Sequence, residues 1–133
     1  MNITLWVLQI LLAVAFFAHG WMLLFPPANL IEQMNAVMST EFRIFLGVAE
    51  VLAAVGLTLP GLTRILPWLV SASAVGLMIV MVSATVLHVR RGEVSAAVTT
   101  TILLAMSTFV AYMRWKVRPI TPRLAASARV HTT

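Results

Sequence analysis

The stretch Phe42–Pro60, FRIFLGVAEVLAAVGLTLP, decides the fold of this chain. It is apolar enough to cross a bilayer, yet it carries Glu50 in its middle and Arg43 near its start. In a helix, Arg43, Gly47, Glu50 and Ala54 lie on one face. A carboxylate among Leu, Val, Ile and Phe is costly unless it faces other protein or water. We therefore expect the rest of the chain to provide a partner for Glu50.

The composition of the 133 residues is that of a membrane protein: 61% are hydrophobic and 10% are charged, with a mean hydropathy of +0.99. Soluble domains are roughly half apolar and about a quarter charged. The chain has no cysteine, which excludes disulfides, cysteine-bound metals and thiol chemistry. No phosphate-binding loop, nucleophile triad or metal-ligand spacing is present. We therefore predict no metal, no nucleic-acid partner and no enzymatic activity of this chain on its own.

Four apolar segments predict an all-α membrane protein, a bundle of four transmembrane helices spanning residues 5–25, 42–59, 65–89 and 94–113. The dipeptide Pro60-Gly61 is expected to end the second helix. A secretory signal is the competing interpretation of the first segment, which contains Gln9 and His19. Its apolar run is too long for a signal peptide and no basic residue precedes it, so we prefer a retained helix.

The connection at residues 28–41 predicts a short amphipathic helix at the membrane surface, between the first and second spans. An apolar stripe with helical spacing supports it, formed by Leu30, Ile31, Met34, Val37 and Met38. Asn29 and Glu32 have the spacing of a capping box. A disordered loop is the alternative.

The basic residues predict the orientation of the bundle in the cell membrane. Six of them fall on the side that contains both termini and three on the other side, so both termini are expected in the cytoplasm. Residues 114–133 would then form a basic cytoplasmic tail, partly disordered. Arg114, Lys116 and Arg118 are predicted to contact anionic lipid. Alternatively, these charges only determine the topology.

The predicted topology gathers four polar residues in the outer half of the bundle: Glu50, Arg43, His19 and His88. Glu50 would lie about 10 Å inside the outer boundary, at 1.5 Å per residue from Arg43. We predict a pocket that binds a small ligand or relays protons, with no assigned catalytic residue. Alternatively, Glu50 ties helices together, His19 is satisfied by a neighbouring helix and His88 is an ordinary interfacial residue.

The chain resembles the DoxX-like family of small four-helix membrane proteins over most of residues 5–113. Two segments carry this resemblance: RIFLGVAEVLAAVGLTLPGLTRILPWL and SASAVGLMIVMVSATVLHVRRGE. The matching positions are Arg43, Gly47 (one residue later than in the family pattern), Glu50, Gly56, Leu57, Pro60, Met81, Ala84, His88 and Arg90. Phe16 and Gly20 match an F-x-x-x-G pattern of the first helix. Many relatives have a lysine soon after that glycine, whereas this chain continues with Trp21-Met22-Leu23-Leu24.

The resemblance implies two functions for a chain of this kind. Some relatives look like membrane partners of redox systems, and the family name is similar to that of subunits of an archaeal thiosulfate:quinone oxidoreductase. We therefore expect an accessory subunit of a redox or quinone-linked membrane complex, with a quinone as the cofactor and a redox protein as the partner. Other relatives resemble assembly chaperones, including one for nicotinic receptors, so a non-catalytic scaffold is the alternative. A homo-oligomer is compatible with either, and a small-solute transporter would require one.

Overall fold

The computed structural model describes residues 2–124, and this part of the chain is helical without strands. Its helices are α1 (Asn2–Leu24), α2 (Ala28–Val37), α3 (Thr40–Thr63), α4 (Trp68–Arg90) and α5 (Val94–Tyr112), followed by a π-helical turn at Met113–Val117. Four of them are long and apolar enough to cross a membrane, namely α1, α3, α4 and α5 continued by the π-helical turn. The predicted four-helix membrane fold is confirmed.

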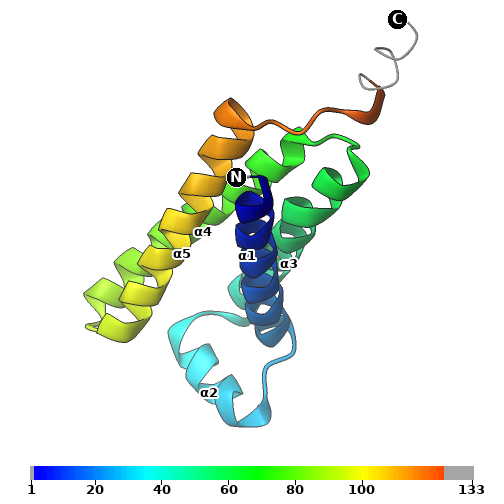
Figure 1. The fold of residues 1–133 in the computed structure, drawn as a ribbon. Helices are drawn as coiled ribbons and strands as arrows, with labels where there is room; N and C mark the ends of the chain where they lie inside the picture. Colours follow the sequence, from blue (N-terminus) through cyan, green and yellow to red (C-terminus); the bar gives the residue numbers. More distant parts are fainter. Residues whose placement is uncertain (1, 125–133) are drawn as a thin grey trace, which may run out of the picture.

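The four long helices form two antiparallel pairs, α1 with α3 and α4 with α5, which are joined mainly by packing of α3 on α4 (Figure 1). The start of α1, the α3–α4 connection and the π-helical turn lie at one end of the bundle, here called the terminal end. Helix α2 and the α4–α5 turn lie at the opposite end. The buried core is made of Leu12, Ala13, Phe16, Ala54, Leu57, Ala74, Leu77, Met81, Val110 and Ala111.

The two ends of α3 follow from local chemistry. Ser39 precedes the helix, and its hydroxyl accepts a hydrogen bond from the backbone N–H of Phe42, as an N-cap should. The helix continues beyond Pro60 to Thr63, so the prediction that Pro60-Gly61 ends it is wrong. Prolines are tolerated in membrane helices because neighbouring helices and small local adjustments satisfy the backbone groups that they free. Arg64 then ends the helix in the left-handed conformation, with φ 57°.

Helix α4 begins three residues later than the sequence indicates. Leu66 also adopts a left-handed backbone, with φ 49°, and Pro67 directly precedes the first helical residue, Trp68. The ring of a proline disfavours the right-handed helical conformation for the residue before it, which explains the break at Leu66.

Helix α2 confirms the predicted helical segment after the first span, but its start differs from the expected capping box. The residue before the helix is Pro27, and no side chain caps it. Asn29 therefore lies inside the first turn. None of the residues of α2 is buried, so this amphipathic helix is packed only loosely on the bundle. The last part of the predicted tail, residues 125–133, lies outside the described residues.

Candidate functional site: a histidine–carboxylate pair between α1 and α3

The partner of Glu50 is His19. Nδ1 of His19 on α1 lies 2.6 Å from Oε2 of Glu50 on α3, which is hydrogen-bonding distance. Glu50 is almost completely buried, with 1% of its side chain exposed, whereas 49% of the His19 side chain is exposed. The buried acid is therefore connected to the surface of the bundle through one imidazole ring.

Two glycines allow α1 and α3 to approach closely enough for this contact. A Cβ atom on Gly20 would lie 2.9 Å from the backbone oxygen of Gly47 and 3.1 Å from Cβ of Glu50. A Cβ atom on Gly47 would lie 3.0 Å from the backbone oxygen of Gly20. Small residues at the crossing point of membrane helices permit such backbone contacts. Because His19 precedes Gly20 directly, the glycine contact also holds the imidazole beside Glu50.

Arg43 lies on the same face of α3 but is engaged differently. It is buried, with 5% exposed, and its Nη1 donates a hydrogen bond to the backbone oxygen of Leu23. Leu23 lies in the last turn of α1, where carbonyl groups have no partner within the helix. Arg43 therefore caps α1, while its Nε and the second carboxylate oxygen of Glu50, Oε1, are buried without a hydrogen-bond partner.

The fourth predicted pocket residue, His88, lies elsewhere. Its Nδ1 is 2.5 Å from Oε2 of Glu93 in the α4–α5 turn, and Arg91 Nε lies 3.3 Å from the other oxygen of that carboxylate. The hydrogen bond with His88 lowers the pKa of Glu93 below its ordinary value. The main packing partners of α1 are α3 and α5, not α4, so the fold does not bring His88 to His19. The structure therefore joins His19 and Glu50, places Arg43 on their face, and separates His88 from them.

A second polar cluster, at the terminal end, was not predicted as a site. Gln9 is fully buried in α1; its Nε2 donates to the backbone oxygen of Leu57 at 2.7 Å, and its Oε1 accepts from Nε of Arg114 at 2.5 Å. Arg114 was expected on the lipid-facing surface with Lys116 and Arg118, but it is buried, with 5% exposed. Gln9 could have indicated this cluster, because it is a polar residue within the first apolar span. The predicted topology places it at about the depth of the end of the fourth span.

The comparison with protein families gives a match over residues 7–110, to the family described as DoxX-like. The chain belongs to the DoxX-like family. The matched region contains His19, Arg43, Glu50 and His88. The suspected resemblance is therefore confirmed, and with it a multi-pass membrane protein. Comparisons with curated proteins and with solved structures give no match.

The pair in this DoxX-like protein can hold and transfer a proton. Nδ1 of His19 is hydrogen-bonded to Glu50, so Nε2 is the imidazole nitrogen that a ligand could reach from the surface. A histidine whose other nitrogen is hydrogen-bonded to a carboxylate has a defined orientation and becomes a better proton acceptor at the free nitrogen. No cluster of three or more metal-ligating His, Cys, Asp or Glu side chains occurs within residues 2–124. The hydrogen-bonded imidazole and carboxylate are suited to holding a proton and to donating or accepting hydrogen bonds.

Proposed function

We propose that this DoxX-like protein is an accessory subunit of a redox or quinone-linked membrane complex, and that its His19–Glu50 pair binds a quinone carbonyl. The observation that supports this proposal is a half-exposed histidine, hydrogen-bonded to a buried carboxylate, in the apolar part of a membrane span. Quinones diffuse within the bilayer, so a quinone can reach a side chain that is exposed on the outside of a bundle. The chain would act through a partner and not as an enzyme alone.

In this proposal, His19 takes up a proton at Nε2 while its Nδ1–H stays hydrogen-bonded to the Glu50 carboxylate, and Nε2–H then donates a hydrogen bond to one carbonyl oxygen of the quinone. When the quinone is reduced to the quinol, that oxygen takes up a proton, which the imidazole can supply. Glu50 then stabilises the orientation of the ring and its positive charge during reprotonation. The electrons come from the partner oxidoreductase. If both termini are cytoplasmic, as the basic residues predict, the pair lies in the outer half of the membrane.

The first test is purification of the full chain in a mild detergent, followed by a visible spectrum and mass spectrometry of bound quinones and proteins. A stoichiometric quinone or an oxidoreductase partner is the expected result. A colourless preparation that contains neither, and that does not bind added quinone, would contradict the proposal.

Variants then locate the site. His19→Gln and Glu50→Gln should each weaken quinone binding at least about tenfold, because each removes a charge-assisted hydrogen bond. The matched controls are His88→Gln and Glu93→Gln, which break a second histidine–carboxylate pair, in the α4–α5 turn, and should leave binding unchanged. Equal losses in both sets would show that the effect does not come from the His19–Glu50 pair.

A second candidate function is non-catalytic assembly of another membrane protein, and one surface favours it. A cavity of about 330 Å³ lies over α3 and α4 and is lined by small residues that include Ala49, Ala53, Ala72 and Gly76. No atom would lie within 4 Å of a Cβ atom on Gly76, so the groove is open to a partner helix, which could approach closely there. The expected observation is a colourless membrane protein that copurifies with the wild type and is lost in Gly76→Leu but retained in Glu50→Gln.

A further inference from the structure

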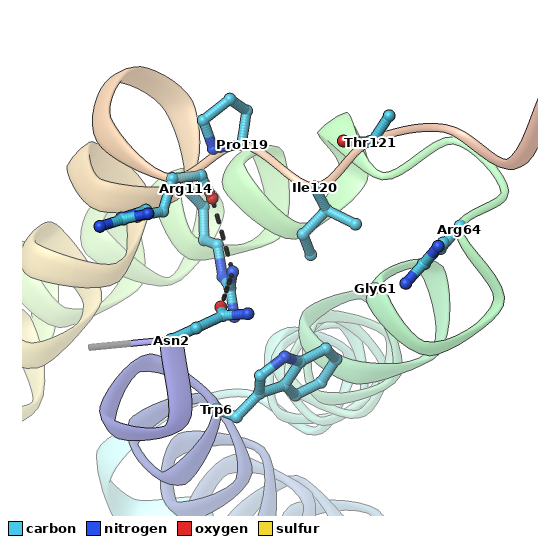
Figure 2. A pocket seen from close by; sticks show the side chains of 9 residues that line it. Asn2, Trp6, Gly61, Arg64, Arg114, Pro119, Ile120 and Thr121 are labelled. Carbon is cyan, nitrogen blue, oxygen red and sulfur yellow. Dashed lines mark hydrogen bonds between the residues drawn. The ribbon is translucent and has the colours of Figure 1, made fainter. Parts of the chain in front are cut away.

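The terminal end of the bundle contains a cavity of about 330 Å³ that is distant in sequence and position from Glu50. Its walls come from the start of α1, the end of α3, the π-helical turn and the segment that follows this turn (Figure 2). Trp6 and Ile120 form an apolar part of the wall and pack against Gly61, where a Cβ atom would lie 2.9 and 3.1 Å from them. Arg64 and Arg114 lie on two sides of this space.

The residue that makes this cavity unusual is Arg114, a buried guanidinium group with only neutral partners. Its Nε donates to Oε1 of Gln9, and its Nη1 donates to Oδ1 of Asn2 at 2.9 Å and to the backbone oxygen of Arg118 at 3.5 Å. The guanidinium carbon lies 5.3 Å from the centre of the Trp6 ring, a cation–π contact. Nη2 is buried and has no hydrogen-bond partner. A buried charge without a counterion is costly.

Within residues 2–124, no acidic side chain supplies a counterion to Arg114. The chain has four acidic residues, and all of them are placed away from the cavity. Glu32 on α2, Glu41 at the start of α3 and Glu93 in the α4–α5 turn lie toward the opposite end, and Glu50 is paired with His19. The cavity is lined instead by three arginines, Arg64, Arg114 and Arg118.

We infer that this cavity is a binding site for a phosphate-bearing anion, with Arg114 as its buried anchor and Arg64 as its second cationic contact. A guanidinium group donates charge-assisted hydrogen bonds to phosphate oxygens, and Nη2 of Arg114 has no partner among the described residues. The volume exceeds that of a phosphate group alone and leaves room for an attached polar fragment. The apolar wall of Trp6 and Ile120 would contact that fragment.

Two sources can provide this chemistry: the head group of a phospholipid or a free phosphorylated solute. The cavity lies at the end of the membrane-spanning helices, where phospholipid phosphates are found. It also opens at the surface of the bundle, so a dissolved anion can enter. The inference does not depend on the quinone proposal, because the two sites share no residue.

The test uses the full chain, delipidated in a neutral detergent, and measures binding by calorimetry. The probes are inorganic phosphate, a short-chain phosphatidic acid and, as a zwitterionic comparison, a short-chain phosphatidylcholine. Arg64→Asn removes one cationic contact at a left-handed backbone position that asparagine tolerates. Gln9→Glu places a carboxylate beside Arg114 Nε and so neutralises the anchor from within. Both variants should bind phosphatidic acid at least about tenfold more weakly than the wild type.

The control is Lys116→Gln, which removes a positive charge at the same end of the bundle from an exposed residue that does not line the cavity. It should change the affinity less than about twofold, because a solvent-exposed charge is screened. Binding of both anionic probes would identify a general phosphate site, and binding of phosphatidic acid alone a lipid site. The inference is overturned if neither anionic probe binds the wild type, or if Lys116→Gln weakens binding as much as Arg64→Asn.

Discussion

The contact between Gly20 and Gly47 predicts that a single added methyl group will separate α1 from α3. In Gly20→Ala, the new Cβ atom would lie 2.9 Å from the backbone oxygen of Gly47 and 3.1 Å from Cβ of Glu50. Neither atom is the end of a flexible side chain, so the helices themselves must move. Overpacking of this kind costs about 1–3 kcal/mol. Because the added methyl group would press on Cβ of Glu50, the hydrogen bond between Glu50 and His19 should lengthen at the same time.

The matched control is Gly76→Ala, which makes the same chemical change in another membrane span, at a position where no atom lies within 4 Å of the added Cβ. The intrinsic gain in helix propensity from glycine to alanine, about 1 kcal/mol, applies to both variants and cancels in their comparison. Gly20→Ala should therefore be less stable than Gly76→Ala by about 1–3 kcal/mol, a factor of roughly 5–150 in the ratio of folded to unfolded protein.

Reversible unfolding in mixed detergent micelles, followed by circular dichroism, measures this difference. A double-mutant cycle with His19→Gln and Glu50→Gln provides a second readout. The coupling between these side chains should be about 0.6–1.7 kcal/mol in the wild-type background, the range of hydrogen bonds between membrane helices. It should fall in the Gly20→Ala background. Equal stability of Gly20→Ala and Gly76→Ala, with unchanged coupling, would refute the close α1–α3 crossing.

Two further predictions concern the remaining polar contacts. Gln9→Leu should lower the free energy of unfolding by about 1–3 kcal/mol, because it leaves Nε of Arg114 without its buried partner; unfolding in mixed micelles measures this, and an unchanged stability would contradict the hydrogen bond. Glu93→Gln should lower the melting temperature at pH 6. The hydrogen bond with His88 holds the pKa of Glu93 below its ordinary value of 4.5, so its stabilisation is present above pH 4.5 and is lost as the pH falls through the folded-state pKa. Melting curves of wild type and variant should therefore converge in acid, and a constant difference would argue against the pair.

The spans, and the need of Glu50 for a partner, could be predicted from the sequence because both depend on position along the membrane. Runs of apolar residues define where helices cross, and the rise of 1.5 Å per residue then places His19 and Glu50 at similar depths. The prediction that Glu50 needs a partner on another helix follows from the cost of an isolated carboxylate in hydrocarbon. Which helix supplies the partner depends on lateral packing, and this information lies in Gly20 and Gly47, whose contact only the structure shows.

Two charged or titratable residues make contacts that the sequence did not predict, and the reasons are local. His88 was assigned to the pocket because of its depth in the bundle. Its hydrogen-bond partner is instead Glu93, five residues later in the sequence. The turn at Gly92, where φ is 72°, brings the two side chains together. Arg114 was predicted to contact anionic lipid as part of the basic tail, and its burial against Gln9 was not foreseen. The π-helical turn at Met113–Val117 instead directs it toward Gln9, and a turn of this kind has no clear signal in the sequence.

The distribution of the few charged residues explains why the two ends of this bundle differ in what they can bind. Toward the end away from the termini, Glu50 and Glu93 are each paired with a histidine within the protein. At the terminal end, Arg114 is buried against neutral oxygens, and Arg64 and Arg118 line the same cavity without a carboxylate. A proton-transferring pair accepts a neutral ligand, whereas an uncompensated guanidinium group requires an anion. The quinone proposed for the first site and the phosphate proposed for the second differ in chemistry as well as in position, so a variant that loses one ligand should still bind the other.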